Sequence, residues 1–159
     1  MAEWLSQTNQ KLYQARLLLD ALDAYEVSNN SPAAIISALQ ESVLFQLMLA
    51  YQSYLHEIAE MAQWRESVIS LTQLIDDAPT VTGEMRELKK LEEDDFGWLC
   101  QLLMAFHQCG DKNSAAVKTV NNPSIIKIQD TASASLPLRD WYDRLIDLID
   151  LQRNNRQES

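Results

Sequence analysis

The chain has 159 residues, of which 47% are hydrophobic and 23% are charged, and its formal net charge is −10. This length is typical of one domain, and such a domain can bury enough surface to fold without disulfides or a metal. The negative charge repels a phosphate backbone and therefore disfavours nucleic-acid binding. The chain has only 3 Gly and 4 Pro, too few for a sheet-rich protein with many tight turns. We therefore expect a single, helical domain over residues 1–159.

The first predicted helix covers residues 3–26. Its apolar and small residues recur at alternating spacings of three and four, which is the pattern of one buried helix face. These residues are Leu5, Thr8, Leu12, Ala15, Leu19 and Leu22. Residues 27–32 form a turn, and Pro32 suits the first position of a second helix. Because the connection is short, we expect the second helix to run antiparallel to the first.

The second predicted helix, residues 33–62, is the longest apolar stretch and contains neither Gly nor Pro. It is apolar at almost every position from Val43 to Tyr51. A helix that is apolar on all sides is usually buried, so this one is predicted to be the centre of the fold. Glu41 and Gln46 interrupt the apolar run, and we therefore expect no membrane span.

The rest of the chain contains shorter amphipathic segments. Residues 66–77, 85–91, 96–109 and 137–152 show helical periodicity, whereas residues 111–136 show none. The predicted fold is all-α, an antiparallel bundle of four main helices with one or two short ones. A long irregular loop, residues 111–136, precedes the last helix, and the polar tail, residues 153–159, is predicted to fray.

The start of the chain lacks a basic region followed by an apolar signal core, so we expect a cytoplasmic protein. Aromatic residues are enriched at protein interfaces, and the four tryptophans therefore suggest a protein partner or self-association. The alternative for each tryptophan is ordinary packing in the core. The four residues are Trp4, Trp64, Trp98 and Trp141.

Three segments of the first 60 residues resemble a family of small, uncharacterised helical proteins from gammaproteobacteria. They are TNQKLYxARL at residues 8–17, ExxLFxL at residues 41–47 and YLHEI at residues 54–58. The resemblance implies a one-domain, helical, bacterial protein. It implies nothing about chemistry, because the family has no assigned activity.

The first candidate site is a polar cluster between the first two helices, made of Asn9, Lys11, Arg16 and Glu41. Apolar residues flank Glu41, so its carboxylate is predicted to be partly buried and to need a partner. Arg16 is the natural partner, since a guanidinium can donate two hydrogen bonds to one carboxylate. The pair would either recognise a small polar ligand or fix the register of the two helices, and the second explanation is the simpler one.

The second candidate is His56. Glu60 lies one helical turn away, and a histidine beside a carboxylate can act as an acid or base near neutral pH. However, the sequence contains neither the GxSxG motif of a serine nucleophile nor an HExxH metal motif. An exposed ion pair within the helix explains the same residues.

The third candidate is a set of paired carboxylates, Glu57 with Glu60 and Glu92 with Asp95. Each pair is spaced by one helical turn, and two facing pairs could bind Mg²⁺ through hard oxygen ligands. All-α nucleotide pyrophosphohydrolases use a similar ExxE…ExxD arrangement. In a chain with 23 acidic residues, however, such pairs also arise by chance.

The sequence contains no Gly-rich phosphate loop, no CxxC and no GxSxG. We therefore predict a non-catalytic, cytoplasmic, helical binding or interaction module without a cofactor. The alternative hypothesis is a Mg²⁺-dependent nucleotide or phosphate hydrolase that uses the four helix carboxylates.

Overall fold

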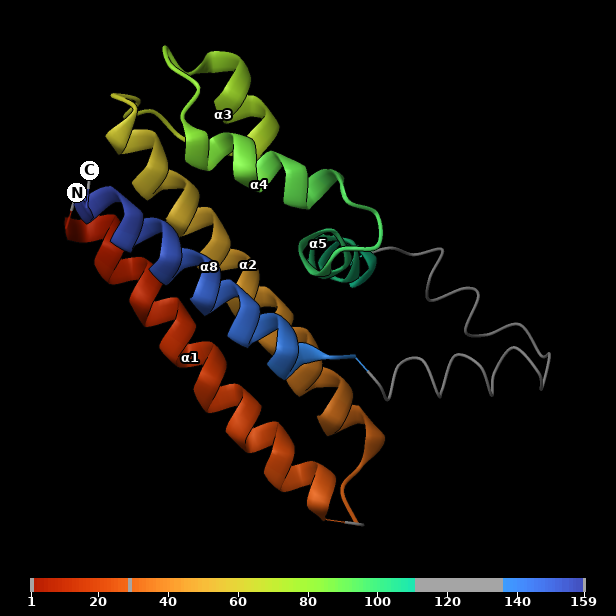
Figure 1. Ribbon diagram of the computed structural model, residues 1–159. Coiled ribbons are helices and arrows are strands. Elements are labelled where there is room, and N and C mark those ends of the chain that lie inside the picture. The colour runs from red at the N-terminus through yellow and green to blue at the C-terminus, as the bar shows by residue number, and fades with distance from the viewer. Residues whose placement is uncertain (1, 29, 111–135, 159) are drawn as a thin grey trace.

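The computed structural model describes residues 2–28, 30–110 and 136–158 (Figure 1). These residues form six helices and no strand, which confirms the all-α prediction for this part of the chain. The helices are α1 (Ala2–Val27), α2 (Ala33–Met61), α3 (Leu71–Asp77), α4 (Gly83–Glu93), α5 (Trp98–Gln108) and α8 (Leu138–Glu158). The predicted loop over residues 111–136 lies, except for Leu136, outside the described residues.

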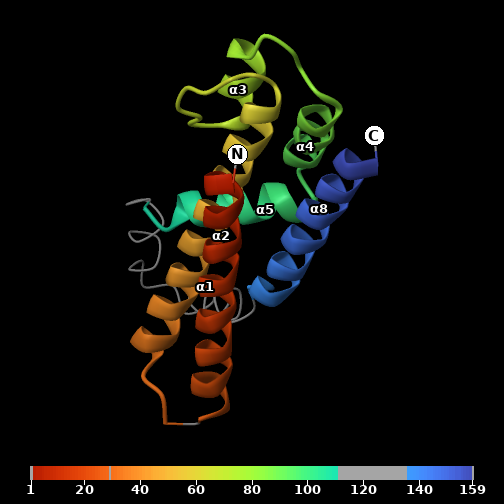
Figure 2. The ribbon, with the colours of Figure 1, turned by 90° about the vertical axis from the view of Figure 1, so that its left-hand side faces the viewer.

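Three long helices run along one another. The pair α1 and α2 is antiparallel, as predicted, and α8 packs against both while running in the same direction as α2 (Figure 1). By contrast, α5 runs across the long helices, and α3 and α4 lie near the end of the fold that holds both termini (Figure 2). The predicted antiparallel bundle of four main helices is therefore not confirmed, because α5 does not lie along the other three.

The seam of α1 faces the core from Thr8 to Leu22 as its spacing predicted, whereas Leu5, the first residue of the predicted seam, is 42% exposed. Leu12, Ala15, Leu19 and Leu22 are buried. Thr8 is buried in the same row, and its hydroxyl donates a hydrogen bond to the Trp4 carbonyl at 2.9 Å. Each fully buried leucine stabilises the fold by about 1.5–3 kcal/mol, so this row holds α1 against its neighbours.

Helix α2 is the central element, because it packs against α1, α5 and α8. It is also the one helix among the described residues that is long and apolar enough to cross a membrane, judged by length and composition. The central helix of a soluble protein meets the same criterion, so this is weak evidence for a membrane span.

Capping side chains set the starts of α3 and α4. The Ser70 hydroxyl accepts a hydrogen bond from the Gln73 backbone N–H at 3.1 Å, and the Thr82 hydroxyl accepts one from Met85 at 3.2 Å. Each such cap typically stabilises a helix by about 1 kcal/mol. The amphipathic stretch predicted from residue 66 therefore becomes helical only at Leu71, directly after its cap.

The end of α8 corrects the prediction of a frayed tail. The helix continues to Glu158, beyond the expected end at residue 152. Arg153 and Arg156 lie on its buried side and form ion pairs with acidic residues of α2 and α4. These pairs hold the last turns in place although the sequence there is polar.

Candidate functional site

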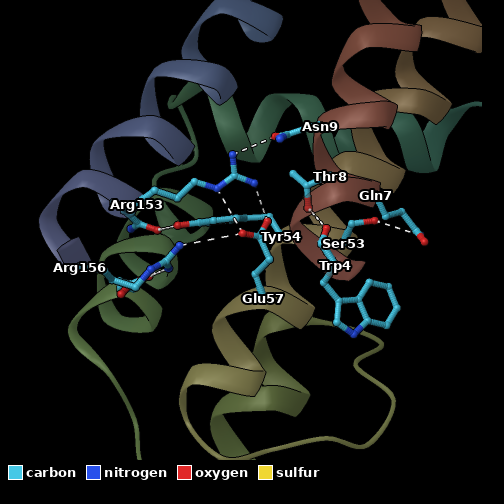
Figure 3. Close-up of polar contacts among 11 residues, drawn as sticks. Trp4, Gln7, Thr8, Asn9, Ser53, Tyr54, Glu57, Arg153 and Arg156 are labelled. Atoms are coloured by element: carbon cyan, nitrogen blue, oxygen red, sulfur yellow. Dashed lines mark hydrogen bonds and ion pairs between the residues drawn. The ribbon is translucent and has the colours of Figure 1, made fainter. Parts of the chain in front are cut away.

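A buried ion pair joins α2 to α8 (Figure 3). The Glu57 carboxylate accepts hydrogen bonds from Arg153 at both oxygens, at 2.8 Å from Nη2 and 3.2 Å from Nε. Only 6% of the Glu57 side chain and 15% of the Arg153 side chain are exposed. A two-point contact of this kind fixes the plane of the guanidinium as well as its position. Asn9 of α1 also accepts a hydrogen bond from Arg153, at 2.9 Å, so the pair connects all three long helices.

A second arginine extends this network toward α4. Arg156 donates a hydrogen bond from Nη1 to Glu84, and its Nη2 lies 4.0 Å from the nearer oxygen of Glu57. Burial raises the pKa of the Glu84 carboxyl above its ordinary value, and the Arg156 guanidinium opposes that rise. The cluster therefore contains carboxylates from α2 and α4 around two guanidiniums from α8.

Tyr54 contacts both arginines of the network and Gln152. Its side chain is fully buried, and its hydroxyl donates a hydrogen bond to the Gln152 side-chain oxygen at 2.6 Å. The guanidinium carbons of Arg153 and Arg156 lie 6.0 Å and 5.8 Å from the centre of its ring. Burial raises the pKa of Tyr54 well above its ordinary value, so the phenol stays protonated and acts as a donor.

Beside this network is a pocket of about 310 Å³. It is lined by Leu5, Glu57, Glu60, Met61, Arg153, Arg156 and Gln157. Leu5 and Met61 are 42% and 47% exposed, although both are large apolar residues. The pocket lining therefore combines apolar residues of α1 and α2 with charged residues of α2 and α8.

His56, which precedes Glu57 in α2, is held by contacts with Trp4, Gln52 and Val68. Its ring stacks on Trp4 with 3.9 Å between the ring centres. Its Nε2 is 3.2 Å from the Val68 backbone N–H and its Nδ1 is 2.8 Å from the Gln52 carbonyl oxygen. This arrangement requires the neutral tautomer that carries its proton on Nδ1, because Nε2 must accept. Nδ1 thus ties the ring to its own helix, and Nε2 holds the segment after α2 at Val68.

The predicted polar cluster between α1 and α2 does not form. Arg16 and Glu41 are both exposed, and no ion pair joins them, so the prediction of a buried pair is wrong. Arg16 instead lies over the Tyr13 ring, 5.7 Å from its centre. Lys11 donates a hydrogen bond to Gln14 on its own helix at 3.3 Å. Of the four residues, only Asn9 belongs to the network around Glu57.

The four carboxylates of the hydrolase hypothesis lie in different surroundings. Glu57 and Glu60 line the pocket. Glu92 accepts a hydrogen bond from the Tyr51 hydroxyl at 2.5 Å and lines a separate hollow of about 200 Å³, and Asp95 is exposed. Within the described ranges, no group of three or more His, Cys, Asp or Glu residues could hold a metal ion. The geometry therefore does not favour a Mg²⁺ site on these residues.

The tryptophans are packed to different degrees. Trp141 is buried in the core, so the suggestion that it marks an interaction surface is wrong. Trp64 and Trp98 are partly buried against the core, and Trp4 is partly buried on His56.

The residues of α8 that complete the site are not recognisable as site residues from the sequence pattern. Gln152, Arg153 and Arg156 lie where that pattern predicts the end of a helix or a frayed tail. Their positions nevertheless continue the spacing of three and four that begins at Trp141 and Leu145. The helical spacing thus continues while the residues on the buried face change from apolar to basic. This continued spacing is the sequence pattern that indicates a longer helix.

Comparisons with known proteins bear on the identity of the chain. No curated protein and no solved structure matches it. One family model matches over residues 1–159, and its description is a family of unknown function, DUF6586. The chain therefore belongs to this family of unknown function.

Proposed function

We propose that the protein is a non-catalytic binding module and that the pocket beside Glu57, Arg153 and Arg156 is its ligand site. The observation that carries the proposal is the pocket itself, which combines about 310 Å³ of space with both apolar and charged lining residues. This volume is at the lower end of the range of small-molecule sites, about 300–1,000 Å³. Apolar walls with a few fixed polar groups are typical of such sites.

The charged residues of the pocket lining suit binding better than catalysis. Both oxygens of Glu57 accept hydrogen bonds from Arg153, so this carboxylate is engaged in an ion pair rather than turned toward a substrate. The lining residues in the described part of the chain include no Ser, Cys, His or Lys that could serve as a nucleophile. The cytoplasmic location and a protein partner or self-association remain predictions beside this proposal.

A thermal-shift screen with apolar-bodied small molecules tests the proposal. A ligand present at 100 times its dissociation constant stabilises the folded state by about 2.7 kcal/mol, which raises the melting temperature measurably. We expect compounds that raise the melting temperature of the wild type to lose this effect in Leu5→Trp, which fills the pocket.

Leu17→Trp is the matched control, because Leu17 is an exposed leucine of the same helix and does not line the pocket. The effect should persist in this variant. If no compound stabilises the wild type, or if the effect survives in Leu5→Trp, the pocket is not the ligand site.

A further inference from the structure

We infer that the pocket beside Glu57 takes an uncharged amphiphile, a small molecule with an apolar body and a neutral polar group such as a hydroxyl or an amide. The inference rests on the proposed function and names the chemical class of the ligand. It follows from two observations on the lining. Its charged side chains already interact within the protein, and its apolar side chains remain partly uncovered.

The charged side chains around the pocket pair with one another (Figure 3). Glu57 accepts hydrogen bonds from Arg153 at both oxygens, and Arg156 donates one to Glu84. Glu60 also takes part in an interaction within the protein. These interactions compensate the charges locally, and the pocket therefore presents a ligand with ion pairs rather than with single charges.

A charged ligand of either sign would disturb these pairs. An ammonium group would lose water and compete with Arg153 for the oxygens of Glu57, which is only 6% exposed. A carboxylate would compete with Glu57 or Glu84 for the donors of the two arginines. In both cases a partner of an existing pair is left poorly solvated and uncompensated, which is strongly unfavourable. A neutral ligand leaves both pairs intact.

The apolar residues of the lining favour a ligand with an apolar body. Leu5 of α1 and Met61 at the end of α2 line the pocket, and they are 42% and 47% exposed. Burial of one ligand methylene group improves the affinity by about fourfold. Methionine adapts its shape readily to such a body, because its side chain is unbranched and polarisable.

Gln157 is the uncharged polar residue of the lining. It is exposed and lies near the end of α8. A side-chain amide offers both a donor and an acceptor, so it can hydrogen-bond a hydroxyl or an amide of the ligand in either direction. A neutral polar group therefore finds a neutral partner in this pocket without separating an ion pair.

A nuclear magnetic resonance titration with three probes of equal chain length tests the inference. The probes are 1-hexanol, hexylammonium chloride and sodium hexanoate at pH 7, in about 0.3 M salt to screen the long-range field of the chain's net charge. We expect 1-hexanol to bind about tenfold more tightly than either ion, because each ion loses hydration without gaining an unpaired partner.

Two matched variants locate the bound probe. Met61→Ser should weaken the binding of 1-hexanol by about fourfold or more, since it removes apolar surface from the lining. Met104→Ser changes a methionine of α5 that is 52% exposed and does not line the pocket, and it should leave the affinity unchanged.

The outcomes separate the two proposals. If none of the probes binds, or if Met104→Ser weakens the binding of 1-hexanol as much as Met61→Ser does, the pocket is not the ligand site and the proposed function fails as well. If 1-hexanol binds at the pocket but hexylammonium or hexanoate binds as tightly or more tightly, the proposed function stands and the inference of an uncharged ligand is overturned.

Discussion

Residues 33–50 and residues 51–61 belong to one continuous helix, α2, but they are buried to different degrees. The first part is the more apolar, and only five of its 18 residues are buried, namely Gln40, Val43, Leu44, Leu47 and Ala50. In the second part seven of 11 residues are buried, namely Tyr51, Ser53, Tyr54, Leu55, Glu57, Ile58 and Ala59. Burial along this helix therefore does not follow local hydrophobicity.

The neighbours of each part explain the difference. Around residues 51–61 the helix meets α8 through Glu57 and Tyr54, and it meets α4 through Tyr51. The turn end of the α1–α2 pair extends beyond the start of α8, so the first part of α2 has fewer described helices around it (Figure 1). Polar residues in the second part are buried because partners from other helices satisfy their hydrogen bonds.

The largest expected difference between the two parts concerns their acidic residues. Glu57→Ala should lower the free energy of unfolding by about 3–5 kcal/mol, because it leaves Arg153 poorly solvated without its partner. Glu41→Ala, an exposed acid in the first part, should change it by no more than about 0.5 kcal/mol. Urea unfolding followed by circular dichroism measures both, and equal losses would contradict the comparison.

Apolar residues should show the same contrast. Leu55 is 1% exposed and Phe45, ten positions earlier on the same helix, is 50% exposed. Leu55→Ala should cost about 2–5 kcal/mol, since it leaves a cavity in the core. Phe45→Ala should cost less than about 1.5 kcal/mol, because only half of its surface is removed from water. A larger loss for Phe45→Ala would show that this part of α2 is covered in solution.

Sequence patterns predict those features of the fold that depend on residues close together in the chain, and they do not predict contacts between residues far apart in the chain. The buried seam of α1 from Leu12 to Leu22 is predicted from local spacing and is confirmed. The antiparallel arrangement of α1 and α2 is predicted from the short connection between them and is also confirmed. The partner of Glu57 is 96 residues away, at Arg153, and no local pattern relates the two. The predicted pairing of Arg16 with Glu41 is also wrong. Whether these two side chains meet depends on how the two helices are rotated about their axes, which local spacing does not determine.

The hydrogen bond beneath the two arginines should contribute less than the ion pair. Tyr54→Phe removes the donor of the Gln152 side-chain oxygen and leaves that buried atom unsatisfied, at a cost of about 1–3 kcal/mol. Tyr13→Phe, which removes the hydroxyl of an exposed tyrosine on α1, is the matched control and should have almost no effect. A cost for Tyr54→Phe no greater than that of the control would exclude a stabilising role for this bond.

The smallest effect is expected at Glu92, which meets α2 at Tyr51. Burial raises the pKa of the Glu92 carboxyl, and the hydrogen bond from Tyr51 opposes this only in part. Between the ordinary pKa and the raised one, the folded state binds more protons than the unfolded state. The free energy of unfolding therefore falls as the pH rises through this window.

Glu92→Gln should remove this contribution to the pH dependence, and its amide oxygen can still accept from Tyr51. At pH 7 the variant should be at least as stable as the wild type. Denaturant unfolding between pH 4 and pH 7 compares the free energies of unfolding of the variant and the wild type. A variant that is less stable than the wild type at pH 7 but equally stable at pH 4 would contradict the predicted direction of the pH dependence.

The most direct test of the ligand site is a titration of 1-hexanol, a small apolar-bodied probe, into protein with carbon-13-labelled methionine methyl groups. Met61 lines the pocket, Met48 lies in the first part of the same helix, and Met104 is exposed on α5. We predict a saturable shift of the Met61 signal while the signals of Met48 and Met104 stay in place. Equal shifts of all three, or a shift of Met48 or Met104 without Met61, would contradict the assignment of the ligand site to the end of α2.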